Sequence, residues 1–512
     1  MIKYSYYVVI YVENMKITTE LAKRLSGIAI ISNDVNDDML EKYTLEELHS
    51  KIVSFFEGKD GIKILNNETL DLIMKKDEEK KPEIVEVYQP ISFKPIAKDV
   101  DADYKIRVSR VEKTGTSIGD FTSYFNDRFK KLKEILSYRR NVGMIITTDK
   151  IAEYTNGKEI SIVGIVNSKI ITKKGNIMLN IEDEEGSAKV LFLKPEKTGR
   201  KEVIEAFESS KKIITDEVIA IKGRISSPFI IANQLLFPDI PIHQRKQSEE
   251  DLAIAFTSDV HIGSKLFLEK EFMRFIEWLN GNVDYKKDLA AKIKYIVFGG
   301  DIVDGIGVYP EQDKELNILD IYKQYSTFFR YIEMIPDYIK IFVIPGNHDA
   351  VQRADPQPMI SNDLVGDFKK ENVNFLTSPS FLEINGLKVL AYHGTSLDSV
   401  IHNITGCSYF KPETAMVEIL KRRHVSPIYG DNPINPGKTD PLVMEDVPDI
   451  LHMGHVHKNG TSEYHGTQIV NSGTWQARTN YQIKLGHLPT PSILPIYETK
   501  TGVMKEISFS GV

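Results

Sequence analysis

The sequence of 512 residues contains a single cysteine, Cys407. One thiol excludes a disulfide framework and any zinc site built from several cysteines, and it favours a reducing, intracellular setting. A surplus of one charge is also missing, because 65 Lys and Arg residues stand against 72 Asp and Glu residues, a formal net charge of −7. Any contact with nucleic acid would therefore be local or shared with a partner.

Long hydrophobic runs are absent as well. The apolar stretch near the start, YYVVIYV (6–12), has seven residues, whereas a membrane helix needs about 20. It also lacks the basic leader and small-residue cleavage site of a signal peptide. We interpret it as a short strand or as an extension upstream of a start at Met15. The sequence thus predicts no membrane segment and no targeting signal.

The length predicts two to four domains, at roughly 150 residues per domain. Residues 1–74 are expected to form a helical N-terminal module, since Thr44 and Glu47 make a capping box before apolar residues at helical spacing (Leu45, Leu48, Ile52 and Phe55). The charged run KKDEEKKPE (75–83) opens a stretch, 75–119, that we expect to be a linker.

Residues 120–240 are predicted to hold an amphipathic helix and a small β-barrel. The helix, over 120–136, has one apolar stripe (Phe121, Tyr124, Phe125, Phe129, Leu132 and Leu136) and a basic opposite face. Packing of the stripe is favoured over contact with nucleic acid. About five alternating strands with a helical interruption at 203–210 then predict an OB-type barrel. Its strands carry few aromatics, so a structural or protein-binding role is at least as well supported as single-strand binding.

Residues 252–512 alternate short apolar strands with amphipathic helices, which predicts an α/β domain with helices covering a central sheet. The fold class is therefore multidomain α/β. The expected strands are LAIAFT, KYIVF, KIFVI, KVLAY, DILHM and TQIVN.

Polar side chains follow five of these strands directly. They are Asp259 and His261, Asp301 and Asp304, Asn347 and His348, His393, and His455 and His457. Each motif alone has an ordinary structural explanation, such as a tight turn or a helix cap. Five uncompensated polar clusters at matching ends of one sheet would cost several kcal/mol, so we expect them to share a ligand.

The residue types select the ligand. Oxygen and imidazole groups without thiolate suit Mn²⁺, Fe²⁺ or Zn²⁺. Two neighbouring ions need a bridging carboxylate, and Asp301 is the natural bridge, while the two histidines of GHVH suit separate ions. The residues alone predict a binuclear metallohydrolase with no indication of its substrate.

The motifs DxH, GDxxD, GNHD, a histidine before glycine, and GHxH, in this order, resemble those of the calcineurin-like metallophosphoesterases. Together with the N-terminal module, the barrel, and the segments 120–136 and 471–498, the chain resembles the small subunits of archaeal family-D DNA polymerases. The resemblance implies a C-terminal metallophosphoesterase sandwich with 3′–5′ exonuclease activity that proofreads for a polymerase. It also implies a large catalytic subunit, DNA and, through the holoenzyme, the sliding clamp as partners, in the cytoplasm at the nucleoid.

The same resemblance implies roles for individual residues. Two divalent ions are expected, with Mn²⁺ favoured. Asp259, His261, Asp301 and His457 would hold the first, and Asp301, Asn347, His393 and His455 the second. His348 would be the catalytic acid, oriented by Asp304, and Asp349 would support the turn. The alternative is a catalytically silent scaffold for the large subunit, because the equivalent eukaryotic subunits have lost their ligands.

The role of one further cluster remains open. A basic cluster at Lys421, Arg422 and Arg423, with His402 nearby in sequence, suits either phosphate contacts or a solvated helix end. His424, His452 and His465 are expected to be structural.

Overall fold

A computed structural model describes residues 21, 24–25, 30–31, 44–56, 64–65, 67, 69–70, 73, 93–109, 117–196 and 199–510. The chain divides into two compact units, Met1–Ser92 and Phe93–Val512. The predictions for residues 6–12 and for the charged run 75–83 lie outside the described residues. None of the helices described is both long and apolar enough to cross a membrane.

The first unit contains the predicted helix, α3 (Leu45–Phe56). Its capping box is present, because the backbone N–H of Thr44 donates to Glu47 Oε2 (2.8 Å) and that of Glu47 donates to Thr44 Oγ1 (3.3 Å). Leu48 and Ile52 are buried on one face of the helix, as their spacing predicts. A short parallel pair, β1 (Ile30–Ile31) with β2 (Ile64–Leu65), accompanies the helix.

In the second unit, five strands close into a barrel in the order β4-β5-β6-β8-β7. They are β4 (Glu159–Ile171), β5 (Ile177–Glu182), β6 (Ser187–Phe192), β7 (Val218–Ser226) and β8 (Phe229–Leu236). Alternation fills the barrel, since every second residue of β5 points inward (Ile177, Leu179 and Ile181). Between β6 and β7 lies α6 (Lys201–Ser210), as predicted.

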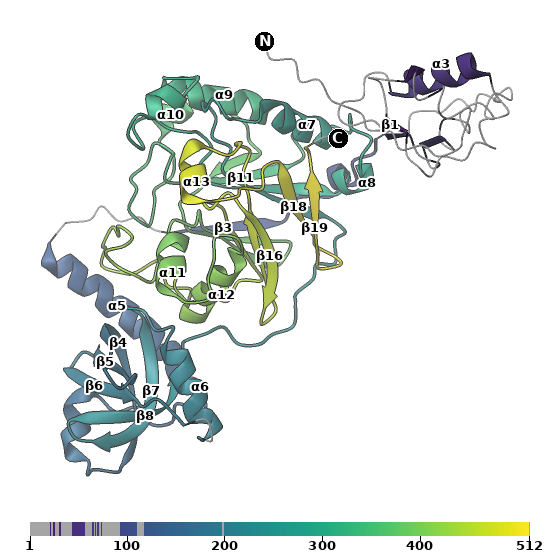
Figure 1. The fold of residues 1–512 in the computed structure, drawn as a ribbon. Coiled ribbons are helices and arrows are strands. Elements are labelled where there is room, and N and C mark those ends of the chain that lie inside the picture. Colours follow the sequence, from purple (N-terminus) through teal and green to yellow (C-terminus); the bar gives the residue numbers. More distant parts are fainter. Residues whose placement is uncertain are drawn as a thin grey trace, which may run out of the picture. The chain divides into compact units, whose positions relative to one another are not determined.

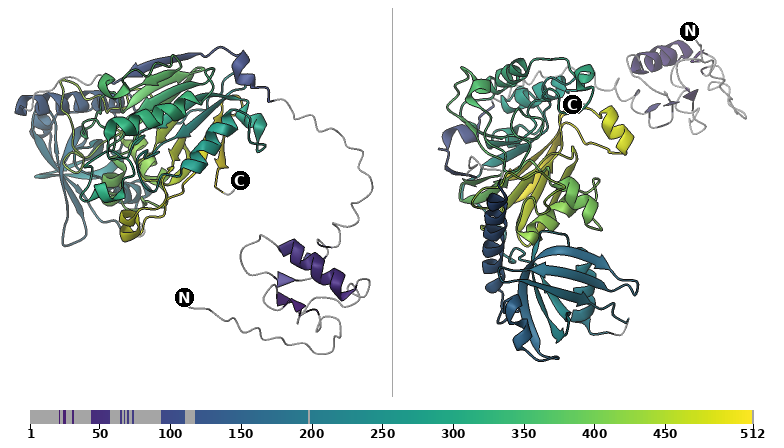
Figure 2. Two further views of the ribbon diagram at one scale, coloured as in Figure 1. Left: turned by 90° about the horizontal axis from the view of Figure 1, so that it is seen from above. Right: turned by 90° about the vertical axis from the view of Figure 1, so that its left-hand side faces the viewer.

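Helix α5 (Ile118–Ser137) lies along this barrel (Figure 1, Figure 2). Its stripe residues Phe129, Leu132 and Leu136 pack in one cluster with strand residues Val163 and Val218. The predicted packing of the stripe is therefore confirmed.

The rest of the second unit contains two six-stranded mixed sheets. The first has the order β12-β11-β10-β9-β18-β19 and consists of β9 (Ala253–Thr257), β10 (Ile293–Gly299), β11 (Lys340–Ile344), β12 (Val373–Phe375), β18 (Ile493–Glu498) and β19 (Val503–Ser508). The second has the order β16-β17-β15-β14-β13-β3 and consists of β3 (Tyr104–Val108), β13 (Ser380–Ile384), β14 (Leu387–Ala391), β15 (Ile450–Met453), β16 (Asn459–Tyr464) and β17 (Thr467–Ser472).

All six expected strands form, but the prediction of one central sheet is wrong. β9, β10 and β11 are parallel neighbours in the first sheet, whereas β14, β15 and β17 are parallel neighbours in the second. Residues expected to be a linker also join this architecture, since β3 pairs with β13 along its whole length and a 3₁₀ helix covers Ile96–Asp99. An apolar strand pattern shows that a strand is buried but does not show which sheet it joins.

The two sheets pack face to face between layers of helices. In β9, Ile254 and Phe256 belong to the apolar core between the sheets, while Ala253 and Ala255 face the core that contains α7 (Glu269–Leu279) and α9 (Ile321–Glu333). On the far side, α11 (Leu397–Asn403) and α12 (Glu413–Arg422) cover the second sheet (Figure 1). Shorter elements complete the unit: α8 (Lys287–Ala290), α10 (Asn362–Val365), α13 (Asn480–Leu485), and 3₁₀ helices at Thr148–Glu153 and Gln312–Glu315.

Candidate metal centre

The seven predicted ligands leave the ends of five strands and meet where the two sheets come together. β9, β10 and β11 deliver Asp259, His261, Asp301 and Asn347 from the first sheet, and β14 and β15 deliver His393, His455 and His457 from the second. The strand ends therefore converge as expected, but from two sheets rather than one. All seven are linked by the contacts described below.

The backbone at these positions is strained. Five of the seven hold a positive φ: Asp259 (51°), His261 (53°), Asp301 (50°), His455 (69°) and His457 (55°). The left-handed region costs residues with a Cβ about 1–2 kcal/mol each, although Asp tolerates it better than most. Strain of this kind is concentrated at functional sites, where it holds side chains in place.

Two glycines allow the turns to approach the carboxylates. A Cβ at Gly454 would overlap Asp259 Oδ2, and a Cβ at Gly346 would overlap Asp301 Oδ1. The glycines of GHVH and GNHD are therefore required by close packing around the buried carboxylates.

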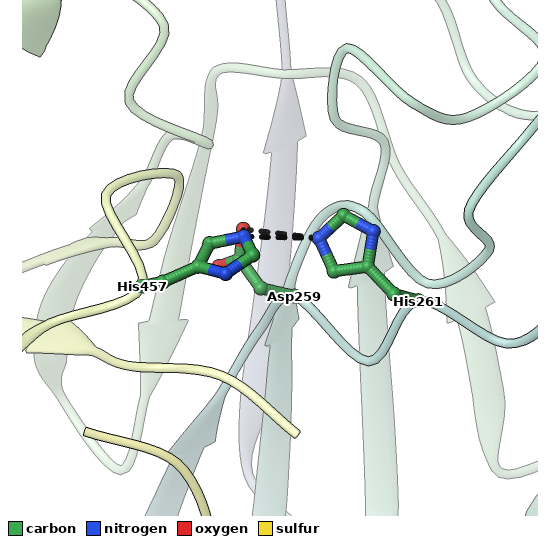
Figure 3. Close-up of side chains that lie close together, drawn as sticks. All are labelled: Asp259, His261 and His457. Atoms are coloured by element: carbon green, nitrogen blue, oxygen red, sulfur yellow. Dashed lines mark hydrogen bonds and ion pairs between the residues drawn. The ribbon is translucent and has the colours of Figure 1, made fainter. Parts of the chain in front are cut away.

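The first group of side chains consists of Asp259, His261 and His457, which point toward one another (Figure 3). The Nε2 atoms of the two histidines lie 3.0 Å apart, and His457 Nε2 lies 3.3 Å from Asp259 Oδ1. His261 Nε2 also lies 3.9 Å from Asp301 Oδ2. These spacings suit donors that share one ion, since each lies about 2 Å from a bound metal.

The second group consists of Asp301, Asn347, His393 and His455. His393 Nε2 lies 3.3 Å from Asp301 Oδ2 and 3.0 Å from Asn347 Oδ1. His455 Nδ1 lies 3.0 Å from the same amide oxygen. Asp301 thus contacts both groups, which is the placement expected of a bridging carboxylate.

The outward ring nitrogens are held by neighbouring groups. His261 Nδ1 donates to Asp304 Oδ1 (2.9 Å), and His393 Nδ1 donates to the carbonyl of Gly299 (2.8 Å). Such bonds fix the tautomer, leaving Nε2 with the lone pair that a metal ligand needs.

His348 contacts Asp304 in a way that the sequence could not specify. Its Nδ1 donates to the backbone carbonyl of Asp304 (2.8 Å), while the Asp304 carboxylate contacts His261 and accepts from Gln476 Nε2 (3.0 Å). The carboxylate of Asp304 therefore orients a candidate ligand, and only its backbone orients His348. Asp349 accepts from the backbone N–H of Gly346 (2.8 Å), so its predicted support of the turn is confirmed.

Charges in the site are strongly coupled. Burial lowers the pKa of His393, but the charge and hydrogen bond of Asp301 outweigh burial and raise this pKa to about 10. Burial raises the pKa of Asp301, yet the positive charges of His393 and His348 hold it well below its usual range. Protonated histidines thus balance the buried carboxylates, and a metal ion that binds here would displace protons.

The donor set fits two divalent ions. It offers two aspartates, one amide oxygen and four imidazoles, with no thiolate, and the groups of Asp259, His261 and His457 and of Asp259, Asp301 and His393 each bring three ligand atoms close together. Such a set accepts Mn²⁺, Fe²⁺ or Zn²⁺.

Comparison with known proteins gives the family. Residues 254–461 match the family model of the B-subunits of DNA polymerases alpha and epsilon. The DNA polymerase II small subunit of Archaeoglobus fulgidus is 43% identical over 384 residues, which are 74% of this chain and 75% of the relative. This chain belongs to the family of archaeal family-D DNA polymerase small subunits. The small subunit of Methanothermobacter thermautotrophicus is 38% identical over 87% of this chain and 90% of its own length, and that of Methanocaldococcus jannaschii is 40% identical over 79% and 68%.

The basic cluster of this polymerase small subunit fits neither alternative that the sequence left open. Arg422 is buried, with its Nε 2.6 Å from Glu217 Oε2 of the barrel and its Nη1 2.8 Å from Glu418 Oε2. Arg423 is buried too and donates to the carbonyls of Met444 and Glu445 (2.6 Å each). These arginines fasten the barrel and the chain around α12, so they are not available to phosphate. The spacing of charges along a helix does not show that one of its arginines pairs with a glutamate of a distant domain.

The three histidines expected to be structural in the small subunit are so placed. His424 Nε2 donates to Asp440 Oδ2 (2.8 Å), and His452 contacts Ser472 Oγ through Nε2 (2.9 Å). His465 Nδ1 donates to the carbonyl of Ile240 (2.9 Å). Within the described part of the chain, no side-chain hydrogen bond or ion pair joins any of the three to the seven candidate ligands.

Two residues of the site do not follow from the sequence motifs. His455 Nε2 donates to Asp398 Oδ2 (3.0 Å), and Gln482 Nε2 lies 2.9 Å from His457 Nδ1. Gln482 could have been found, because Thr479 and Gln482 form a capping box at the start of α13 that fixes the turn. Asp398 lies at the start of α11, and no local pattern marks it.

Proposed function

We propose that this small subunit is a metal-dependent phosphodiesterase that removes nucleotides from the 3′ end of DNA. In this proposal the two-sheet domain acts as a calcineurin-like metallophosphoesterase and the closed barrel as an OB-type domain. Its partner is the large catalytic subunit of the polymerase, for which it proofreads.

One observation supports the proposal most strongly. All seven predicted ligands are linked through pairwise contacts of 3.0–3.9 Å, and five of them lie on strained backbone. A chain that served only as a scaffold would gain nothing from burying these carboxylates and histidines together, and their burial is costly without a ligand.

Each site residue has a specific role in the proposed reaction. Asp259, His261 and His457 would hold one ion, and Asn347, His393 and His455 the other, with Asp301 shared. When bound, two such ions neutralise phosphate charge and activate water for in-line attack. His348 carries a proton at Nδ1, which it donates to the carbonyl of Asp304, so its Nε2 is the atom that delivers a second proton to the leaving 3′ oxygen. Burial lowers the pKa of His348, and the negative charge of a bound phosphate acts in the opposite direction by favouring the protonated ring.

A single-stranded oligonucleotide labelled at its 5′ end tests the proposal. With Mn²⁺, the full chain, alone or co-purified with its large subunit, should shorten the oligonucleotide stepwise from the 3′ end. His348→Ala and Asp301→Asn should abolish the ladder. Asp149→Asn, the same chemical change at an exposed position of the barrel domain, should retain it.

The remaining outcomes are also informative. Cleavage that survives both substitutions would point to a contaminating nuclease and contradict the proposed site. No cleavage by either the chain or the complex would overturn the nuclease function and leave the silent scaffold.

A further inference from the structure

Arg478 lies beside the candidate metal centre, in the segment that joins β17 to α13. Its position is fixed from both sides. Two residues earlier, Gln476 Nε2 donates to Asp304 Oδ1 (3.0 Å), and four residues later Gln482 Nε2 lies 2.9 Å from His457 Nδ1. The backbone that carries Arg478 is therefore held between two residues of the site.

The chain after this segment also reaches the side of the site that includes His455, since the backbone N–H of His487 donates to the carbonyl of Gln482 (2.8 Å). The ring of His487 packs on that of Tyr409, with centroids 4.3 Å apart, and the Tyr409 hydroxyl donates to Asp398 Oδ1 (2.9 Å). Asp398 in turn accepts from His455. Burial lowers the pKa of His487; the charge of Asp398 raises it, and the charges of His402 and Arg478 lower it further.

The charge of Arg478 is not satisfied within the described chain. The side chain is half-buried, its Nε is buried without a hydrogen-bond partner, and no described carboxylate forms an ion pair with it. Arg128 and Arg422 also have a buried N–H without a hydrogen-bond partner, but each has an ion-pair partner: Arg128 lies 2.7 Å from Asp440, and Arg422 lies 2.6 Å from Glu217. A guanidinium that is partly removed from water and left unpaired costs stability, so its retention calls for an anion.

We propose that Arg478 binds a backbone phosphate of the DNA strand whose end enters the metal centre. The guanidinium offers paired N–H donors that match two phosphate oxygens, a geometry that lysine does not reproduce. This assignment rests on the proposed nuclease function. In a chain that is acidic overall, the Arg478 guanidinium would supply a positive charge for the negatively charged DNA strand at this site.

Binding without turnover tests the proposal independently of cleavage. Fluorescence anisotropy of a labelled single-stranded oligodeoxynucleotide is measured with the full chain in EDTA over a series of NaCl concentrations. For Arg478→Gln, we expect binding about tenfold weaker, because one charge-assisted contact is lost. The slope of log K against log salt should fall in magnitude by about 0.7, the value for one phosphate contact on a single strand.

Two variants and one further measurement separate this role from others. Arg478→Lys should keep the salt slope but bind more weakly than wild type, since it keeps the charge and loses the paired donors. Arg140→Gln, the same charge change at an exposed position after α5, should bind as wild type does. The thermal midpoint of Arg478→Gln should be unchanged or higher, because an unpaired charge is removed.

Several results would overturn the proposal: no salt-dependent binding by the wild type, an unchanged slope in Arg478→Gln, an equal loss in Arg140→Gln, or a lowered thermal midpoint in Arg478→Gln. The last result would indicate a structural role. Absence of Mn²⁺-dependent cleavage would contradict the nuclease function alone, since the binding assay contains no metal and leaves the DNA uncut.

Discussion

Removal of the shared carboxylate should abolish stabilisation of the fold by metal. Asp301 contacts both candidate groups, and Asp301→Asn replaces this shared carboxylate by an uncharged amide. In the wild type, two ions at 100 times their Kd would add about 2.7 kcal/mol each, or about 5 kcal/mol together. With an unfolding entropy of roughly 2.1 cal/mol/K per residue over residues 93–512, this corresponds to a rise in Tm of about 6 °C.

Differential scanning fluorimetry in EDTA and in increasing Mn²⁺ measures this rise. Asp301→Asn should reduce it to below about 2 °C, on the reasoning that both ions lose a ligand. The comparison is between shifts, because the substitution also alters the bond that Asp301 accepts from the backbone N–H of His348 (2.7 Å). His348→Ala should keep the full shift, as its ring lies outside both ligand groups, and so should Asp149→Asn. A full shift in Asp301→Asn would refute the reasoning.

Three further predictions concern packing and charge. Gly454→Ala should remove the Mn²⁺-induced rise in Tm, because its Cβ would overlap the Asp259 carboxylate. Gly119→Ala in α5 should keep that rise, because its Cβ would make only an ordinary contact with Ser117 Oγ (3.6 Å). Burial, together with the charge of Arg128, lowers the pKa of His424 to about 4. A histidine that is neutral in the folded state contributes its full stability above its unfolded pKa of about 6.5, and this contribution is lost as the pH falls toward 4. Between these two pH values, the free energy of unfolding of His424→Gln should therefore improve by about 3 kcal/mol relative to that of the wild type. Denaturation titrations at several pH values measure this difference. Arg422→Leu should cost about 3–5 kcal/mol in guanidinium unfolding, because Glu217 stays buried without its ion-pair partner, while Glu418 keeps Lys212 and Lys421. The double variant Arg422→Leu with Glu217→Leu should recover part of this loss; equal losses in both variants would contradict the pairing.

Much of the site could be predicted from sequence because its chemistry is local. Each ligand directly follows an apolar strand, and the carboxyl ends of parallel strands gather at one edge, so Asp259, Asp301, Asn347, His393 and His455 could be expected to meet. The amphipathic helix α5 and the barrel strands are likewise visible in their periodicity, because one face of each is buried within the same domain.

The errors and omissions have a common cause, which is that pairing over long distances leaves no local pattern. The apolar pattern of the strands does not reveal the second sheet, since β14 and β15 are as apolar as β9 and β10. The sequence of β3, YKIRV, suits a linker because it has only one partly buried residue and pairs with a strand far along the chain. Arg422 suits a solvated or DNA-binding face because Glu217, its partner, comes from another domain.

Binding of two metal ions by the seven side chains is the central claim. Crystals of the full chain grown with Mn²⁺, with data collected at the manganese absorption edge, test it most directly. We expect two anomalous peaks about 3.5–4 Å apart, one at Asp259, His261 and His457 and one at Asn347, His393 and His455, with Asp301 between them. The absence of both peaks at saturating Mn²⁺, or peaks elsewhere on the surface, would contradict it.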